Sequence, residues 1–243
     1  MIEKKELGKT GIILRRVGLG GIPIQRITKE EAVKVIGYAI DKGVNFIDSA
    51  RGYTCSESYI GEAIHDRRND IYLATKSMAR TYVQMKEDID FSLKNFQTDY
   101  IDLYQMHNVK NRDEFMKIIS DGGAYKALLE AKECGKIHSI GITAHSQDFL
   151  KWLIKSEYCN LIETVQFPIN FIEDNGIELL KLAKTKNLGT IAMKPLGGGA
   201  IDNGKTAIKW LLNLDCLDVA IPGMGDVKEI DDIFSIEDYA IND

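Results

Sequence analysis

Apolar runs rich in β-branched residues recur along the chain at a nearly regular interval, and they constrain its fold more than any other feature. Most runs are almost continuous in Val, Ile, Leu and Ala, which is typical of parallel strands covered on both faces. The predicted strands are residues 17–21, 44–49, 70–76, 100–107, 137–144, 164–169, 189–195 and 218–222.

Helical patterns separate these runs. Thr28 and Glu31 predict a capping box at the start of the first helix. Gly43, Gly135 and Gly189 stand between a helix and the next strand, where a C-terminal cap glycine is expected. Further helices are predicted over residues 56–65, 82–96, 124–134, 146–157, 176–186, 205–214 and 226–234.

Eight strands alternating with eight helices predict an α/β protein, a single (β/α)8 TIM barrel over residues 1–243. The alternative is an open doubly wound sheet. It fits less well, because no GxGxxG follows the first strand and the polar strand-end residues come from many strands. Residues 5–14 predict an N-terminal β-hairpin that closes the barrel bottom.

The composition argues against several classes of protein. The net charge is −5 and no Lys/Arg block occurs, so we expect no nucleic-acid partner. No run reaches membrane-spanning length and the start lacks a signal-like segment, so we expect a cytoplasmic protein with no membrane partner. The four scattered cysteines form no CxxC, so no metal is expected. The sequence indicates no particular oligomeric state.

Four chemically active side chains fall at or just beyond the ends of predicted strands: Asp48, Tyr53, Lys76 and His107. The carboxyl ends of parallel barrel strands are where active sites are built. Each residue alone has a structural explanation: a cap, a packed ring, a solvated cation or a core histidine. Together, a carboxylate, a phenol, a cation and an imidazole indicate a site for proton transfer.

The chain resembles the aldo-keto reductases over essentially its whole length. No single motif is specific, but the series in order is. It comprises residues 7–11 and 17–20, the Asp48-to-Tyr53 spacing followed by Ser56-Glu57, Thr75-Lys76, Met106-His107, residues 140–143, Val165-Gln166 with Asn170, and residues 195–197 and 221–223.

The resemblance implies reduction of an aldehyde or ketone carbonyl of a small-molecule substrate by NAD(P)H. Tyr53 would donate the proton, and Lys76 would lower the pKa of that phenol. Asp48 would hold Lys76, and His107 would orient the substrate oxygen and stabilise its developing charge. The expected substrate pocket is mostly apolar and is lined by Ile22, Pro23, Met78 and Asn108.

The resemblance also implies a nicotinamide site. Thr143 and Gln166 would hold the carboxamide, although Ala144 replaces an Asn that is frequent in the family. Met193 stands where an aromatic ring often stacks on the nicotinamide. The other expected cofactor residues are Lys194, Pro195, Leu196, Gly197, Gly199, Gly223 and Lys228, with the glycine-rich loop near the pyrophosphate.

Cofactor choice follows from the segment after the last strand. Asp226 and Glu229 would repel a 2′-phosphate, and Glu229 stands where an Arg is common in the family. The resemblance to the family implies NADP as the cofactor, with NAD as the alternative. The sequence ends at Asp243 without the C-terminal loop or iron–sulfur tail that relatives carry.

Two other functions remain open. A strand-end lysine in a barrel can be a nucleophile, so Lys76 also fits a Schiff-base lyase. A nucleotide-binding regulatory protein with little turnover would keep the same fold, and Ala144 leaves this alternative open. The pairing of Asp48 with Tyr53 favours the reductase.

Overall fold

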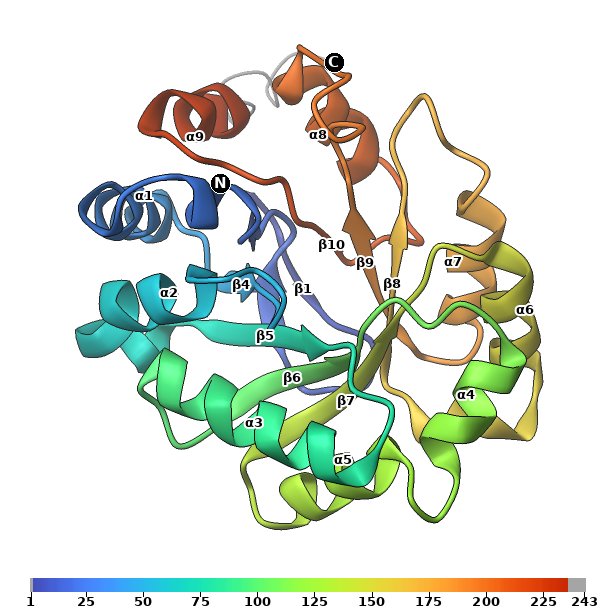
Figure 1. The fold of residues 1–243 in the computed structure, drawn as a ribbon. Helices are drawn as coiled ribbons and strands as arrows, with labels where there is room; N and C mark the ends of the chain where they lie inside the picture. The colour runs from blue at the N-terminus through green and yellow to red at the C-terminus, as the bar shows by residue number, and fades with distance from the viewer. Residues whose placement is uncertain (1, 236–243) are drawn as a thin grey trace.

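The computed structural model describes residues 2–235, and its centre is a parallel sheet surrounded by helices (Figure 1). Eight strands pair side by side in chain order. They are β3 (Leu19–Gly20), β4 (Phe46–Asp48), β5 (Tyr72–Ser77), β6 (Ile101–Met106), β7 (Ile137–Thr143), β8 (Thr164–Pro168), β9 (Gly189–Met193) and β10 (Val219–Ala220). The predicted strands are therefore confirmed, with somewhat shorter bounds.

The first and last strand segments also pair with each other. Gly18 N–H donates to the Ala220 carbonyl at 2.9 Å, and Gly20 N–H donates to the Pro222 carbonyl at 2.8 Å. Parallel bridges join Val17 to Ala220 and Gly20 to Gly223. These contacts close the sheet, which confirms the predicted (β/α)8 barrel and excludes the open doubly wound alternative.

The helices form the outer layer (Figure 1). They are α1 (Lys29–Asp41), α2 (Ser56–Ile64), α3 (Tyr82–Phe96), α4 (Arg112–Ile119), α5 (Ala124–Glu133), α6 (Gln147–Lys155), α7 (Ile177–Lys184), α8 (Gly204–Leu212) and α9 (Val227–Phe234), with short 3-10 helices η1 (Pro23–Arg26), η2 (His65–Asp70) and η3 (Glu157–Leu161). Helix α4 was not predicted. The sequence feature that could have indicated this helix is Asn111, a residue type favoured at helix N-caps. In the structure its side chain accepts from Glu114 N–H at 2.9 Å.

The helix ends largely follow the predicted caps. The Thr28–Glu31 capping box is present, and Gly43 and Gly135 have φ of 100° and 74°. The expectation for Gly189 is wrong, because this residue begins β9 and Asn187, with φ of 56°, precedes it in the left-handed region. At Gly189 the missing Cβ makes room for Leu7 instead, since a Cβ would lie 2.7 Å from its Cγ.

The N-terminal hairpin closes the barrel bottom as predicted. Its strands β1 (Lys4–Glu6) and β2 (Ile13–Arg15) pair antiparallel. Leu7, Ile12 and Leu14 are buried with interior barrel residues such as Phe46 and Ile191. Gly8, with φ of +57°, lies so close to the start of β9 that an added Cβ would be 2.1 Å from Gly189 N. Only glycine tolerates both conditions.

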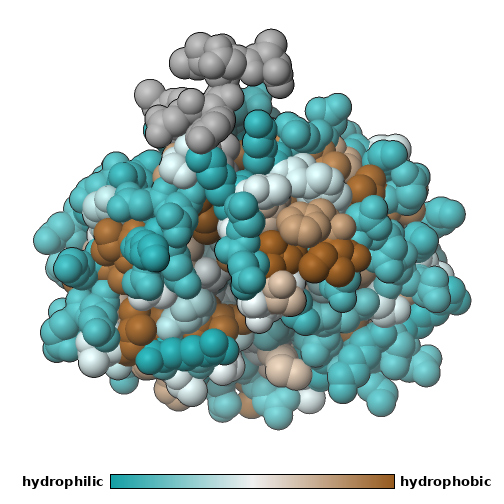
Figure 2. Space-filling model, turned by 90° about the horizontal axis from the view of Figure 1, so that it is seen from above, coloured by the Kyte–Doolittle hydropathy of each residue, from teal (hydrophilic) through white to brown (hydrophobic). Residues whose placement is uncertain are grey.

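Hydrophilic side chains predominate on the face shown in Figure 2, where apolar groups gather in small patches. Across residues 2–235, no helix combines the length and the hydrophobicity that a membrane span requires.

Candidate active site

The barrel strands alternate between an inner and an outer face, and this alternation creates the polar centre. Phe46, Ala74, Leu103 and Ile191 point into the apolar interior cluster above the hairpin. Two residues further along these strands come Asp48, Lys76, Gln105 and Met193. Because side chains repeat their face every second residue, polar groups are brought together directly above an apolar layer.

A buried ion pair lies at the middle of this polar layer. The side chains of Lys76 and Asp48 are 1% and 3% exposed, and Lys76 Nζ donates to Asp48 Oδ2. Lys76 Nζ also donates to the Ser49 carbonyl at 2.7 Å. Asp48 accepts from Gln105 Nε2 at 3.1 Å and from Gln166 Nε2 at 3.4 Å. Asp48 on β4, supported by Gln105 on β6 and Gln166 on β8, thus fixes the position of the ammonium together with the Ser49 carbonyl.

Burial raises the pKa of the Asp48 carboxyl, while the Lys76 ammonium and the amides of Gln166 and Gln105 oppose that shift. A charge left alone in such a place would be costly, so each partner depends on the other. Together they form a neutral pair beside Tyr53, with Lys76 Nζ 5.3 Å from the centre of the Tyr53 ring.

Tyr53 and His107 lie beside this pair. Tyr53 stands in the loop after β4, and His107 directly follows β6. Their rings meet edge to face with centroids 6.2 Å apart. The structure therefore brings all four predicted catalytic side chains together at the carboxyl end of the barrel.

Electrostatics at Tyr53 differ from the prediction. Burial, and then the negative charge of Asp48, raise the pKa of the Tyr53 phenol above its usual range. The expectation of a lowered pKa is wrong, because burial and the Asp48 charge dominate at this phenol. The phenol therefore keeps its proton at neutral pH, as a proton donor must before it reacts.

His107 is uncharged at neutral pH. Burial, followed by the charges of Lys76 and Arg80, lowers the pKa of His107 to about 3. Its Nδ1 is buried without a hydrogen-bond partner among the described residues. A neutral imidazole can orient an oxygen through one N–H without competing with the phenol as the acid.

Two of the predicted cofactor residues are neighbours across the sheet. Thr143 at the end of β7 lies in register with Gln166 on β8. The Thr143 hydroxyl accepts from Asn108 N–H at 2.8 Å, which leaves its own proton to donate. Gln166 Oε1 is buried and has no partner within the described part of the chain. The pair offers one donor and one acceptor.

The loop after β9 contains the predicted cofactor residues between Lys194 and Gly199. Lys194 is strained, with φ of +52°, and Asn170 Nδ2 donates to its carbonyl at 3.2 Å. Gly197 and Gly199 both have positive φ, but their N–H groups donate within the loop, to Lys194 and Leu196. In this conformation the glycines shape the backbone, and those two amides are already engaged. Pro195 is buried beneath the loop, and Leu196 is half-buried.

The last predicted cofactor segment is the start of α9. Gly223 pairs with Gly20 across the closed barrel, and Lys228 is exposed in the first helical turn. Asp226 caps the helix by accepting from Glu229 N–H at 2.8 Å. The Glu229 carboxylate turns back and accepts from Gly225 N–H at 2.6 Å. Two carboxylates therefore already occupy this helix N-terminus.

The predicted substrate residues stand at the rim of the same barrel end. Ile22 follows β3 and is 42% exposed, and Met78 follows β5 and is 56% exposed. Asn108 follows His107 with φ of +51°. They come from three different loops around the polar centre. Their exposure leaves apolar surface available at the entrance.

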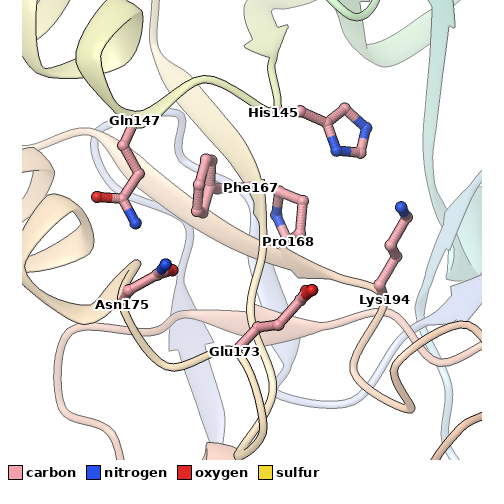
Figure 3. A pocket seen from close by; sticks show the side chains of 7 residues that line it. All are labelled: His145, Gln147, Phe167, Pro168, Glu173, Asn175 and Lys194. Atoms are coloured by element: carbon pink, nitrogen blue, oxygen red, sulfur yellow. The ribbon is translucent and has the colours of Figure 1, made fainter.

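A cavity of about 310 Å³ lies at the ends of β7, β8 and β9 (Figure 3). Gln147 and Asn175 point into one end and His145 and Lys194 into the other, with Phe167 and Pro168 between them. Its lining also includes Glu173. Lys194 was predicted as a site residue. The polar ones among the others were missed because they stand in loops or at a helix start, where polar residues are common, and Phe167 and Pro168 were predicted only as part of a strand.

No group of three or more His, Cys, Asp or Glu side chains is arranged to hold a metal ion within residues 2–235. The four cysteines are free, and two of them, Cys159 and Cys216, are buried.

Several known proteins are similar to this chain. The uncharacterized oxidoreductase YqkF of Bacillus subtilis is 28% identical over 214 residues, covering 82% of this chain and 67% of the relative. The chain thus spans about two thirds of that relative's length. The holo aldo-keto reductase AKR11C1 of Bacillus halodurans superposes with a TM-score of 0.86 at 20% identity, covering 100% of this chain and 93% of that one.

An aldo-keto reductase of Klebsiella pneumoniae solved in complex with NADPH has a TM-score of 0.83 at 20% identity, covering 100% of this chain and 92% of that one. At such identities the solved structures establish the fold. The model of the aldo/keto reductase family matches residues 16–207, which is more than half of the 243 residues. The chain therefore belongs to the aldo/keto reductase family, a family of NAD(P)-dependent oxidoreductases.

Proposed function

We propose that this protein reduces aldehyde or ketone carbonyls of small molecules by hydride transfer, with Tyr53 as the proton donor. The observation that carries the proposal is the buried Lys76–Asp48 pair, whose ammonium lies 5.3 Å from the Tyr53 ring. A protonated phenol, a fixed cation and a neutral imidazole at one barrel mouth suit the delivery of a proton to a carbonyl oxygen.

The residues present fit a nicotinamide. Gln166 Oε1 is a buried acceptor without a partner in the described chain, and the Thr143 hydroxyl beside it has a proton to donate. A carboxamide has the complementary amide donor and carbonyl acceptor, so one group would satisfy both residues. Met193 at the end of β9 is half-buried and packs against the interior cluster, where a thioether can support a flat ring.

When bound, the reduced cofactor supplies a hydride to the carbonyl carbon. The chain provides the rest of the step. His107 orients the carbonyl oxygen through an N–H, and Tyr53 transfers its proton to that oxygen as negative charge develops there. Lys76 then stabilises the phenolate through its positive charge, while Asp48 keeps the ammonium in place. Positioned acid catalysis of this kind is worth roughly 10²–10⁴ in rate.

For the cofactor we propose NADP, with weak discrimination against NAD. The Klebsiella neighbour binds NADPH, and Lys228 offers a positive charge in the first turn of α9. Asp226 and Glu229 oppose strong selection for NADP over NAD, because their carboxylates occupy the N-terminus of α9. A 2′-phosphate approaching there would meet two carboxylates before it could reach the backbone donors.

The Schiff-base alternative requires Lys76 as a neutral nucleophile. The close contact with Asp48 stabilises the ammonium instead, so we favour the reductase. A regulatory nucleotide-binding protein would share the cofactor site but would not need the buried ion pair beside Tyr53.

The proposal is tested by fluorescence titration of the full chain with NADPH and NADH. A panel of aromatic and aliphatic aldehydes follows, in the presence of the tighter-binding cofactor. We expect binding of at least one cofactor and oxidation of that cofactor in proportion to the alcohol formed. Binding without turnover of any aldehyde or ketone would support the regulatory alternative. A product formed without a nicotinamide would support the lyase.

A further inference from the structure

A second buried carboxylate lies outside the barrel wall, behind Lys76. Glu57 on α2 is 1% exposed, and each of its oxygens accepts two hydrogen bonds. Oε1 accepts from the hydroxyls of Thr75 and Ser92, both at 2.8 Å. Oε2 accepts from Arg51 Nη1 at 2.6 Å and from Asn95 Nδ2 at 3.1 Å. A charge buried this deeply is tolerated only because every oxygen is satisfied.

Two of the four partners of Glu57, Thr75 and Arg51, come from the segments that carry Lys76 and Tyr53. Along β5, Lys76 points into the barrel, so its two neighbours point outward. The hydroxyl of Thr75 is held by Glu57. The hydroxyl of Ser77 is held by Asp88 on α3 and also accepts from Ala79 N–H at 2.8 Å. The two residues that flank Lys76 are thus each anchored to a carboxylate.

Both carboxylates also meet Arg51. Besides its bond to Glu57, the guanidinium places Nε 3.5 Å from Asp88 Oδ1, and it lies 5.6 Å from the centre of the Phe91 ring. Arg51 stands two residues before Tyr53 in the same loop. Its own N–H donates to the Lys76 carbonyl at 3.0 Å. The loop is therefore joined to β5 directly by its backbone, and indirectly by the Arg51 side chain through Glu57 and Asp88.

We propose that Arg51 is a positioning residue, which holds the Tyr53 loop and the Lys76 strand in one fixed relation through Glu57 and Asp88. The inference rests on the proposed function for its catalytic meaning, because Tyr53 and Lys76 are the groups it would align. The guanidinium suits this role because its rigid donors can bridge two carboxylates at once. Misplacement of a reacting group by about 1 Å can cost 10²-fold in rate.

The test compares Arg51→Met, Arg51→Lys and the surface control Arg67→Met, whose guanidinium pairs with the exposed Asp41. We expect Arg51→Met to lower kcat for aldehyde reduction by about 10²-fold, with cofactor affinity and the substrate KM little changed. Arg51→Lys should restore part of kcat, and Arg67→Met should keep wild-type kcat. Asp88→Asn keeps the Glu57 contacts and serves as a second variant if Arg51→Met fails to fold.

A direct readout of the phenol separates alignment from mere stability. The protein is labelled with 13Cζ-tyrosine, and the Tyr53 signal is assigned by its loss in Tyr53→Phe. Loosening the loop should admit water to the ring, so the pKa of Tyr53 should move down toward the ordinary value for tyrosine. The pH profile of kcat should move in the same direction.

Arg51→Met with wild-type kcat and an unshifted Tyr53 titration, measured below its melting temperature, would overturn the inference. A lower melting temperature with unchanged kcat would also overturn it, because that result means a purely structural role. If the wild-type protein binds cofactor but reduces no carbonyl, the proposed function fails. The Tyr53 titration then still decides whether Arg51 positions the phenol.

Discussion

Replacing Lys76 by Met should destabilise the protein by about 3–5 kcal/mol at neutral pH, because the change leaves a buried carboxylate without its cation. Asp48 is 3% exposed on its side chain. Its remaining partners would be the amides of Gln105 and Gln166, at 3.1 and 3.4 Å, which cannot neutralise a charge. Met resembles Lys in length, so the loss is mainly electrostatic rather than a cavity.

The same variant should recover stability as the pH falls. Without Lys76 to oppose it, burial holds the pKa of Asp48 far above the value near 3.9 of an unfolded chain. The folded state then binds a proton that the unfolded state releases. Stability therefore rises on acidification, by at most about 1.4 kcal/mol per pH unit, until Asp48 is protonated.

Urea unfolding followed by circular dichroism, at about pH 7.5 and about pH 5.5, measures both effects against the wild type. Asp48→Asn and the double variant complete a thermodynamic cycle. We expect the double variant to lose less stability than the sum of the single losses, because it leaves no unpaired charge. A Lys76→Met loss below about 1 kcal/mol at both pH values, or strictly additive losses, would refute the reasoning that each buried charge needs the other.

Three further outcomes follow from the site. Glu229→Arg should shift the ratio of dissociation constants toward NADPH, while Glu229→Gln should shift it less; an unchanged ratio in fluorescence titrations would place Glu229 away from the 2′ position. Because the pKa of His107 is lowered to about 3, the unfolded chain binds a proton below about pH 6.5 that the folded chain lacks. Wild-type stability should then fall on acidification, by at most about 1.4 kcal/mol per pH unit from this group. His107→Gln should lack that part of the slope in urea midpoints between about pH 6 and pH 4, and parallel slopes would contradict it. Mass spectrometry after borohydride treatment with an aldehyde, and without nicotinamide, should find no adduct on Lys76. A stable adduct there would support the Schiff-base lyase alternative.

The strands and the four candidate catalytic residues could be predicted from the sequence for one physical reason. Buried parallel strands are continuous apolar runs, so a charged residue at the end of such a run is conspicuous. Asp48, Lys76 and His107 are recognisable in this way, and Tyr53 follows from its spacing to Asp48. The N-terminal hairpin was predictable for a similar reason, since its glycines and apolar residues mark a tight turn.

Other parts of the site depend on side-chain partners that a one-dimensional pattern does not specify. Arg51 and Asp88 resemble ordinary charged residues of a loop and a helix face, although both are partly buried and pair with each other beside the buried Glu57. Gln105 did carry a signal, because it shares its strand face with His107. The direction of the Tyr53 pKa shift was predicted wrongly, because the burial of the ring and the nearness of Asp48, which raise this pKa, cannot be read from the sequence.

The central claim is that Tyr53 donates the proton, and a single-turnover experiment with Tyr53→Phe tests it most directly. Protein saturated with reduced cofactor is mixed with an aldehyde in a stopped-flow instrument, and cofactor oxidation is followed by absorbance. Tyr82→Phe is the matched control, because it removes a hydroxyl that donates to Glu130 at 2.6 Å, outside the site.

We predict that Tyr53→Phe binds the cofactor with wild-type affinity and oxidises it at least about 10²-fold more slowly, while Tyr82→Phe keeps the wild-type rate. A Tyr53→Phe protein that oxidises its bound cofactor at the wild-type rate, in a step shown by a deuterium isotope effect to be hydride transfer, would contradict the claim.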